Sequence, residues 1–253
     1  PKAAAVDPAE AVAKAVETAQ GAADAAGKAA ALQPVLDLFA DPSATEAIVA
    51  EASAVLGEVG GLLAAAAAEE CTAELATSIA TGTHLITSFA EAGAAGPAAS
   101  SCVPPVVTLL AAPGPDMSDE KSALLTSACT AAYALASTPP GRSALRKADV
   151  PAALLALLQP AYSSHRALLA QVALTVGRLA ESALSRAAFG SEANLPLLLS
   201  SLTILATPPT PTEALSLRLH AKLLLMLGFC LYDGSMLTSL LDAGLLKYAL
   251  ANL

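Results

Sequence analysis

Few residues of this 253-residue chain are of the types that do chemistry, and they are far apart. His84, His165 and His220 have apolar or hydroxyl neighbours, which is more typical of helix surfaces than of metal ligands. Glu69 and Glu70 are adjacent, so on a helix they point to different sides. The signatures G-x-S-x-G, H-E-x-x-H, G-x-x-x-x-G-K-[ST] and G-x-G-x-x-G are all missing. We therefore expect no enzyme activity, catalytic residue, cofactor or metal.

The cysteines indicate the compartment. Cys71, Cys102, Cys129 and Cys230 are scattered without C-x-x-C spacing, so we interpret them as small buried hydrophobes rather than a disulfide framework or metal site. The opening "PKAAAVDPAEAVAKAVE" has no apolar signal region after its lysine. These features predict a protein of a reducing compartment, with cytoplasmic localisation.

The composition favours helices. Hydrophobic residues make up 55% of the chain, most of them Ala and Leu, while aromatic residues make up 3% and Trp is absent. Ala and Leu head the helix propensity scale, whereas β-branched and aromatic residues favour strands. The composition therefore predicts an all-α protein.

The mean hydropathy of +0.60 makes a membrane-associated helical protein an alternative. The longest uncharged run, Ala92 to Pro115, is interrupted by several glycines and prolines. A spanning helix needs about 20 consecutive apolar residues, so this run is too broken to form one. We expect a soluble chain, and extraction only with detergent would favour the membrane alternative.

Proline-started helices recur along the chain. In "ADVPAALLALLQP", Pro151 begins a leucine-rich helix, and Asp149 just before it favours the helix start. Similar copies begin at Pro104 in "CVPPVVTLLA" and at Pro196 in "ANLPLLLSSLTIL", so these anchors are 47 and 45 residues apart. In a weaker copy, "DAGLLKYALANL", Lys247 takes the proline position 51 residues later. A period of this length is typical of helical repeat proteins.

Each copy has a short helix before it and a longer helix after it. The short helices are predicted in "GRSALRKAD", "SRAAFGSEA" and "TSLLDAG", and the long ones in "SALLTSACTAAYALAST", "RALLAQVALTVGRLAES" and "SLRLHAKLLLMLGFCLY". In the second long helix, apolar residues at spacings near 3.6 predict one buried face: Leu168, Leu169, Val172, Val176 and Leu179. The repeating unit is therefore a short helix, a proline-started helix and a long helix.

This unit resembles the armadillo repeat family, within the armadillo/HEAT class. The resemblance is clearest at "SALRKADVPAALLALL" and "SLLDAGLLKYAL", and in the third-helix segments "AAYALAS" and "ALTVGRLA". It covers about residues 101–253. It implies a right-handed superhelical solenoid of about 4–5 repeats with degenerate N-terminal repeats. Stacked units bury one another's apolar faces, which explains the high hydropathy without a membrane.

The first hundred residues fit the repeat less well. We expect an Ala-rich leading helix, Ala9–Ala30, within residues 1–31, and degenerate helical repeats in residues 32–93. There, Leu32–Pro42 is predicted as a second helix, Ala44–Gly60 as a third and Thr83–Gly93 as a short first helix. Residues 94–253 form the armadillo-like repeats of the same solenoid.

Family members that bind extended peptides present a ladder of Asn on the third helix, lining the concave groove. At the matching positions this sequence has Ser137, Arg178 and, by a looser alignment, Phe229. The resemblance therefore implies a groove without a regular amide ladder, which argues against a nuclear-import-type peptide receptor.

The charges are unevenly distributed. Residues 1–120 have 3 basic and 16 acidic side chains, a net charge of −13, whereas residues 121–253 have 10 and 6, a net charge of +4. Six cations lie within one and a half repeats: Arg142, Arg146, Lys147, Arg166, Arg178 and Arg186. They are either ordinary solvated helix faces or a basic groove that binds an acidic partner segment. Nucleic acid is disfavoured by the acidic total and by the lack of aromatics among these cations.

The last helix stays apolar to its end, with an edge formed by Leu245, Leu246, Tyr248, Leu250 and Leu253. Either the chain is a fragment or another protein covers this edge. We predict a non-enzymatic protein–protein interaction scaffold, a structural subunit of a hetero-oligomeric complex. Similar small armadillo proteins occur as axonemal subunits of cilia, so the resemblance makes a ciliary or cytoskeletal complex one candidate assembly. A soluble adaptor that binds linear peptide motifs or cargo is the main alternative.

Overall fold

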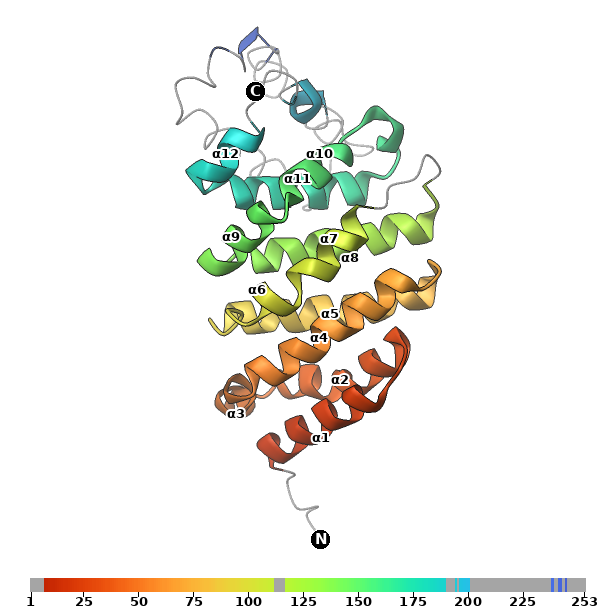
Figure 1. The fold of residues 1–253 in the computed structure, drawn as a ribbon, viewed down its shortest axis with the longest axis vertical. Helices are drawn as coiled ribbons and strands as arrows, with labels where there is room; N and C mark the ends of the chain where they lie inside the picture. Colours follow the sequence, from red (N-terminus) through yellow and green to blue (C-terminus); the bar gives the residue numbers. More distant parts are fainter. Residues whose placement is uncertain are drawn as a thin grey trace, which may run out of the picture. The chain divides into compact units, whose positions relative to one another are not determined.

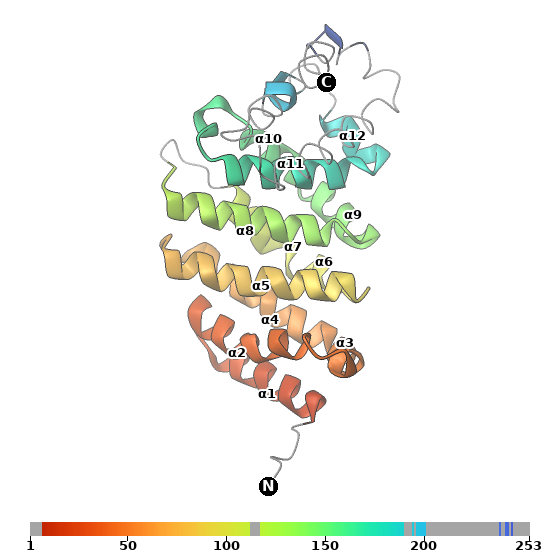
Figure 2. The same cartoon turned by 180° about the vertical axis from the view of Figure 1, so that it is seen from behind.

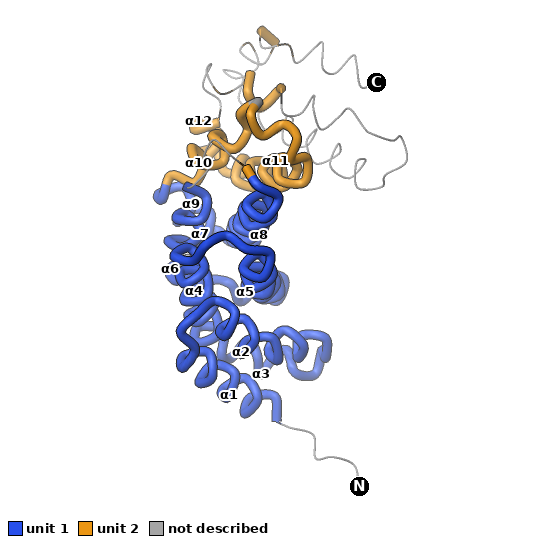
Figure 3. The backbone as a smooth tube through the Cα atoms, turned by 90° about the vertical axis from the view of Figure 1, so that its right-hand side faces the viewer, with its two compact units in different colours: residues 1–112, 118–148 blue, residues 113–117, 149–253 orange. Residues whose placement is uncertain are grey.

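The computed structural model describes residues 7–111, 117–189, 194, 196–200, 238, 241–242 and 244. Within these ranges the regular structure is helical and contains no strand, so the predicted all-α class is confirmed for them. The chain divides into two compact units (Figure 3): unit 1 comprises residues 1–112 and 118–148, and unit 2 comprises residues 113–117 and 149–253. The boundaries expected at 31/32 and 93/94 therefore lie inside unit 1.

Unit 1 is built from α-helices joined by short turns. Its helices are α1 (Pro8–Gly21), α2 (Ala25–Leu38), α3 (Thr45–Ala50), α4 (Ala52–Ala68), α5 (Ala73–Glu91), α6 (Ala98–Ser101), α7 (Val103–Leu110), α8 (Asp119–Leu135) and α9 (Pro139–Lys147), with a 3-10 helix η1 (Pro42–Ala44). The helices of unit 2 are α10 (Val150–Ala156), α11 (Arg166–Ala180) and α12 (Ala183–Phe189), with a 3-10 helix η2 (Pro160–Tyr162).

The long helices of unit 1 form two layers. Helices α1, α4 and α7 face the viewer in Figure 1, and α2, α5 and α8 face the viewer in Figure 2. Within the second layer α5 packs between α2 and α8, and α1, α4 and α7 pack in turn on α2, α5 and α8. The core of unit 1 therefore lies between the layers and between successive helices of each layer.

The order of short, second and third helix recurs along the chain. It occurs as α3–α4–α5, as α6–α7–α8 and as α9–α10–α11. The proline-started second helices are found as predicted at Pro104 in α7 and at Pro151 in α10. The long helices predicted after them are confirmed as α8 and α11.

The three third helices bury the same seven positions. In α5 these are Ser78, Ile79, Gly82, Thr83, Leu85, Ile86 and Phe89. An offset of 46 residues gives the buried set of α8: Leu124, Leu125, Ala128, Cys129, Ala131, Ala132 and Leu135. A further 44 residues give that of α11: Leu168, Leu169, Val172, Ala173, Thr175, Val176 and Leu179. The apolar face predicted for α11 is confirmed and is wider than expected. A buried face this wide is typical of a helix covered on more than one side.

The single leading helix expected over Ala9–Ala30 is wrong, because the segment holds two helices. Helix α1 ends at Gly21, where Ala22 turns to an extended conformation. Asp24 then begins α2 by accepting a hydrogen bond from the Gly27 amide at 2.7 Å. An aspartate at this position favours a new helix start over continuation of the old one.

The segments that follow also differ from expectation. Leu32–Pro42 is not a second helix, because most of it completes α2, which packs on α5 in the layer of third helices. Ala44–Gly60 is not one third helix, because the chain bends by 80° between α3 and α4 at Glu51. Ile48 of α3 and Val55 of α4 are both buried. Helix α3 packs on α1 and α2, whereas α4 packs on these two helices and also on α5, α6 and α7. Thr83–Gly93 belongs to the long α5 and its C-terminal turn.

Helices α4 and α6 approach each other closely at Gly60. A Cβ atom on Gly60 would lie 2.5 Å from the carbonyl oxygen of Ser101. The Ser101 hydroxyl donates a hydrogen bond to the Leu56 carbonyl at 2.9 Å across the same crossing. Position 60 therefore requires glycine, because any side chain would collide with the backbone of α6.

Asp149 begins α10 in a way that the sequence did not indicate. Its backbone lies in the left-handed region, with φ 57° and ψ 30°, and its side chain makes no capping hydrogen bond. Its carbonyl oxygen accepts from the Ala152 and Ala153 amides. Asp149 therefore caps α10 through its backbone carbonyl. Its side chain, whose charge was expected to favour the helix start, makes no capping hydrogen bond.

No single helix among the described residues is long and apolar enough to cross a membrane. Pro42–Ala50 and α4 have the length and the apolar composition of a membrane span only when taken together, and they are bent by 80° relative to each other. Much of α4 is buried inside unit 1, including Val55, Leu56, Leu62 and Leu63.

Candidate functional site

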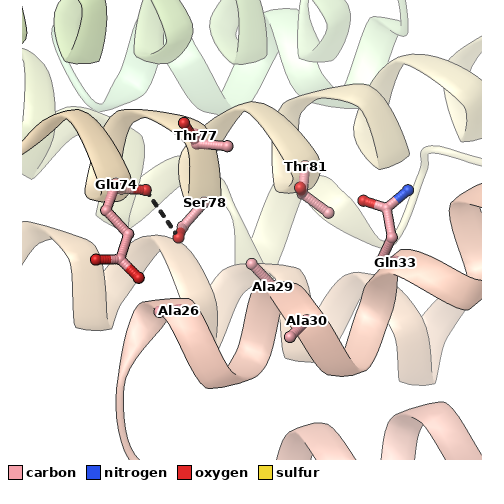
Figure 4. Close-up of a pocket in the computed structure, with 8 residues that line it drawn as sticks. All are labelled: Ala26, Ala29, Ala30, Gln33, Glu74, Thr77, Ser78 and Thr81. Carbon is pink, nitrogen blue, oxygen red and sulfur yellow. Dashed lines mark hydrogen bonds between the residues drawn. The ribbon is translucent and has the colours of Figure 1, made fainter.

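A shallow depression of about 330 Å³ lies between α2 and α5 on the outer side of the third-helix layer of unit 1 (Figure 4). Its lining comes from two helices: Ala26, Ala29, Ala30 and Gln33 from α2, and Glu74, Thr77, Ser78 and Thr81 from the first half of α5. Figure 4 shows Ala26 near Glu74 at one end and Gln33 near Thr81 at the other, so the two helices run in the same direction. Small side chains at facing positions leave the space between these helices unfilled.

Two of the three hydroxyl groups in the lining are bonded within their own helix. Thr77 Oγ1 donates to the Ala73 carbonyl at 3.0 Å, and Ser78 Oγ donates to the Glu74 carbonyl at 3.1 Å. Their hydrogens are used, and only oxygen lone pairs face outward. The side-chain amide of Gln33 donates to Asp37 Oδ1 at 2.8 Å. The lining therefore offers mainly small apolar surface and hydrogen-bond acceptors.

Carboxylates gather at the end of the depression where α2 and α5 begin. Glu69 Oε1 accepts from the Ala25 amide at 2.9 Å, which ties the segment before α5 to the start of α2. Asp24 precedes this start, Glu70 follows Glu69, and Glu74 lies in the first turn of α5. Asp24, Glu70 and Glu74 are exposed.

The cation on α2 is used elsewhere in unit 1. Lys28 Nζ lies 3.1 Å from Glu58 Oε2 of α4 and donates to the Ala19 carbonyl of α1 at 2.8 Å. Its side chain is 14% exposed. Because Lys28 bonds to α1 and α4, it does not neutralise the carboxylates at the start of α5, and the lining of the depression contains no Lys, Arg or His.

The thiols of Cys102 and Cys129 are shielded from solvent. Burial raises the pKa of Cys102 to about 11, and it also raises the pKa of the fully buried Cys129. The prediction of buried cysteines is confirmed for these two and wrong for Cys71, which is exposed. Partial burial, with the nearby Glu120 charge, raises the pKa of Cys71 as well. Cys230 and His220 lie outside the described residues.

No group of three or more His, Cys, Asp and Glu side chains that could hold a metal ion occurs in the described part of the chain. His84 is exposed in the middle of α5, and His165 precedes the first residue of α11. Glu69 and Glu70 lie between α4 and α5, as expected for a solvated helix end.

Arg142 and Arg186, predicted as groove cations, bind carbonyl groups at helix ends. Arg142 Nη1 donates to the carbonyls of Ala136 and Ser137 at 2.8 and 3.4 Å, after the end of α8. Arg186 Nη1 donates to those of Ala180 and Glu181 at 3.0 and 3.3 Å, at the end of α11. A cation at these carbonyls satisfies helix-terminal acceptors and interacts favourably with the helix dipole.

The other four predicted groove cations lie at helix ends. Arg178 forms an ion pair with Glu181, with side-chain exposures of 33% and 31%. Arg146 and Lys147 lie in the last turn of α9, and Arg166 is the first residue of α11. Arg142, Arg146 and Lys147 belong to unit 1, whereas the other three belong to unit 2. A shared basic groove stays a prediction.

The structure corrects one alignment made from the sequence. Ser137 and Arg178 do not occupy equivalent positions, because Ser137 lies beyond the end of α8 while Arg178 lies in the last turn of α11. By the 44-residue offset of the buried faces, Ser137 matches Glu181 and Arg178 matches the buried Ala134. Phe229 and the C-terminal edge, comprising Leu245, Leu246, Tyr248, Leu250 and Leu253, lie outside the described residues.

The depression was not predicted from the sequence. The available signal was a pair of small residues four apart on each of two helices, Ala26 with Ala30 and Thr77 with Thr81. The signal becomes readable only once α2 and α5 are known to be neighbours.

No family model, curated protein or solved structure matches this chain.

Proposed function

We propose that this protein is a non-enzymatic scaffold for protein–protein contacts, built as a right-handed armadillo-like solenoid. The observation that supports this most directly is the set of seven buried positions shared by α5, α8 and α11. A helix unit that repeats its buried face stacks on its neighbours and leaves a row of equivalent outward faces. Such rows are used as binding surfaces in helical repeat proteins.

The outward face of the third-helix layer in unit 1 supports a binding role. Exposed or half-buried positions on α5 and α8 carry mostly small and hydroxyl side chains: Thr77, Ala80, Thr81, Ser88, Ala123, Thr126, Ser127 and Thr130. Side chains of this size lose little conformational entropy when covered. The face therefore suits close contact with another protein surface.

Affinity purification of the tagged full chain with quantitative mass spectrometry and chemical cross-linking tests the proposal. A structural subunit predicts one set of partners at a fixed molar ratio, with cross-links to exposed residues of α2, α5 and α8. Recovery of the tagged chain alone, from several extraction conditions, would contradict a scaffold role.

The depression between α2 and α5 favours a second candidate, an adaptor that binds exchangeable segments of other proteins. Such an adaptor predicts partners at sub-stoichiometric and variable ratios that a competing peptide displaces. Pulse-chase purification distinguishes the two candidates, because subunits of a permanent complex do not exchange on the time scale of the chase.

A further inference from the structure

The depression between α2 and α5 has a shape and a charge that define what covers it. Resting on the proposed function, we propose that it is the docking site for one α-helix of a partner protein, with Lys or Arg side chains at one end of that helix. The helix lies between α2 and α5 and places its basic end next to Glu74.

Hydrogen bonding favours a helix over an extended segment as the occupant. An extended peptide needs partners for its backbone N–H and C=O groups, whereas a helix satisfies its own. The hydroxyls of Thr77 and Ser78 donate to their own helix, and the Gln33 amide is bonded to Asp37. Ala26 and Ala30 offer no side-chain polar group at all. The remaining donors, the Thr81 hydroxyl and the second N–H of Gln33, lie at one end of the depression (Figure 4), so the lining has no regular row of free donors for a peptide backbone.

The rows of small side chains on α2 and α5 form a surface on which another helix can pack. Ala26 and Ala30 on α2, like Thr77 and Thr81 on α5, are four residues apart and lie on the same face of their helix. Rows of side chains at this spacing form the ridges and grooves through which helices pack. Small residues in both rows let the ridge of a partner helix approach the backbones, as in helix-in-groove recognition.

The charge of the rim sets the polarity of the partner. Glu74 lines the depression, the exposed Asp24 and Glu70 lie at the starts of its two helices, and the lining contains no cation. Unit 1 as a whole has 15 acidic and 7 basic side chains. Complementary potentials speed encounter and fix orientation, so the basic end of the partner helix lies at the start of α5.

The test uses the full chain as bait for two displayed peptide libraries of equal size. One presents helices with a randomised face, and the other presents the same residue choices with prolines that keep the peptide extended. Selected peptides are measured by fluorescence anisotropy against wild type, Ala30→Trp and Glu74→Lys. Ala30→Trp fills the depression from an exposed position, and Glu74→Lys reverses its rim charge. The matched controls on α1 are Ala13→Trp, also at an exposed alanine, and Glu10→Lys, also in a helix first turn.

We expect the helical library to give binders enriched in Lys and Arg at one end. Ala30→Trp and Glu74→Lys should each weaken them at least tenfold, while both controls leave affinity within twofold. Dominance of extended peptides that Ala30→Trp abolishes would overturn the helix assignment and leave the proposed binding function standing. Equal losses in Glu74→Lys and Glu10→Lys would overturn the rim charge as a determinant. Binders unaffected by Ala30→Trp, or no binders from either library, would overturn the site itself.

Discussion

Arg142 and Arg186 make the same contact in successive helix units. Each guanidinium donates from Nη1 to the carbonyls six and five residues earlier, at the end of a third helix. The residues are 44 positions apart, which is also the offset between the buried faces of α8 and α11. The ends of α8 and α11 therefore share a polar contact at the same offset as their buried faces.

Arg142→Ala should lower the free energy of unfolding by about 1–2 kcal/mol, because two carbonyls lose a charged donor. Arg146→Ala is the control, because Arg146 lies in the last turn of the same helix α9 and its side chain makes no hydrogen bond to any residue that the structure describes. Urea unfolding followed by circular dichroism measures both. Equal effects of the two variants would contradict the capping role.

Glycines three residues apart in α4 should respond in opposite directions to alanine. Gly60→Ala places a Cβ atom against the Ser101 carbonyl and should destabilise by about 1–3 kcal/mol. At Gly57 no atom lies within 4 Å of the added Cβ, so Gly57→Ala should stabilise the helix by about 0.5–1 kcal/mol. Thermal unfolding of both variants measures these effects. Stabilisation by both substitutions would contradict the close α4–α6 crossing.

Asp149→Gly should raise stability by up to about 1 kcal/mol, because glycine adopts a φ of 57° without the steric cost that other residues have. Asp149→Val should instead destabilise by about 1–2 kcal/mol, since a β-branched residue is strained in that region. Chemical denaturation of the pair measures the difference. A valine variant as stable as the glycine variant would exclude a left-handed backbone at this position.

Labelling with iodoacetamide at pH 8 should modify Cys71 before Cys102 and Cys129. Cys71 is exposed, whereas Cys102 and Cys129 are buried with raised pKa values, so the last two lack both access and thiolate. Peptide mass spectrometry follows each site separately. Addition of denaturant should bring Cys102 and Cys129 to the rate of Cys71, and fast labelling of either without denaturant would contradict their burial.

Stability should fall between pH 9 and 11 partly through Cys102. The unfolded thiol loses its proton near 9.0, but desolvation raises the folded pKa to about 11, so the unfolded state ionises first. The protonated Cys102 thiol contributes about 2–3 kcal/mol to the free energy of unfolding. This contribution is fully present below pH 9 and is lost as the pH rises through 11. Urea unfolding at several pH values should show a steeper alkaline loss for wild type than for Cys102→Ala. Parallel pH profiles would show that Cys102 titrates normally in the folded state.

The sequence predicted the elements whose apolar residues show a clear period. Leu168, Leu169 and Val172 mark the buried face of α11, and Pro151 marks the start of α10, so both helices were placed correctly. Helices α1 and α2 were merged, because alanine occurs on buried and exposed faces alike and leaves no period to read. They are separated by an extended residue at Ala22 and by the cap at Asp24, which acts through one hydrogen bond.

The surfaces were harder to predict than the helices. A sequence gives the charge of Arg142 but not its partners, so its hydrogen bonds to the carbonyls of Ala136 and Ser137 were not predicted. The depression depends on Ala30 and Thr81, which belong to helices that are neighbours only after folding. Small uncharged residues give no signal of a binding surface in a sequence. Here they line the depression where a partner helix is proposed to dock.

The two offsets between third helices, 46 and 44 residues, tell where this chain tolerates insertions and deletions. Each added residue turns a helix face by roughly 100°, so two extra residues inside a helix would expose its buried side chains. All seven buried positions nevertheless match in α5, α8 and α11. The difference of two residues therefore lies in the segments between third helices, where a change in length leaves the register of the helices intact.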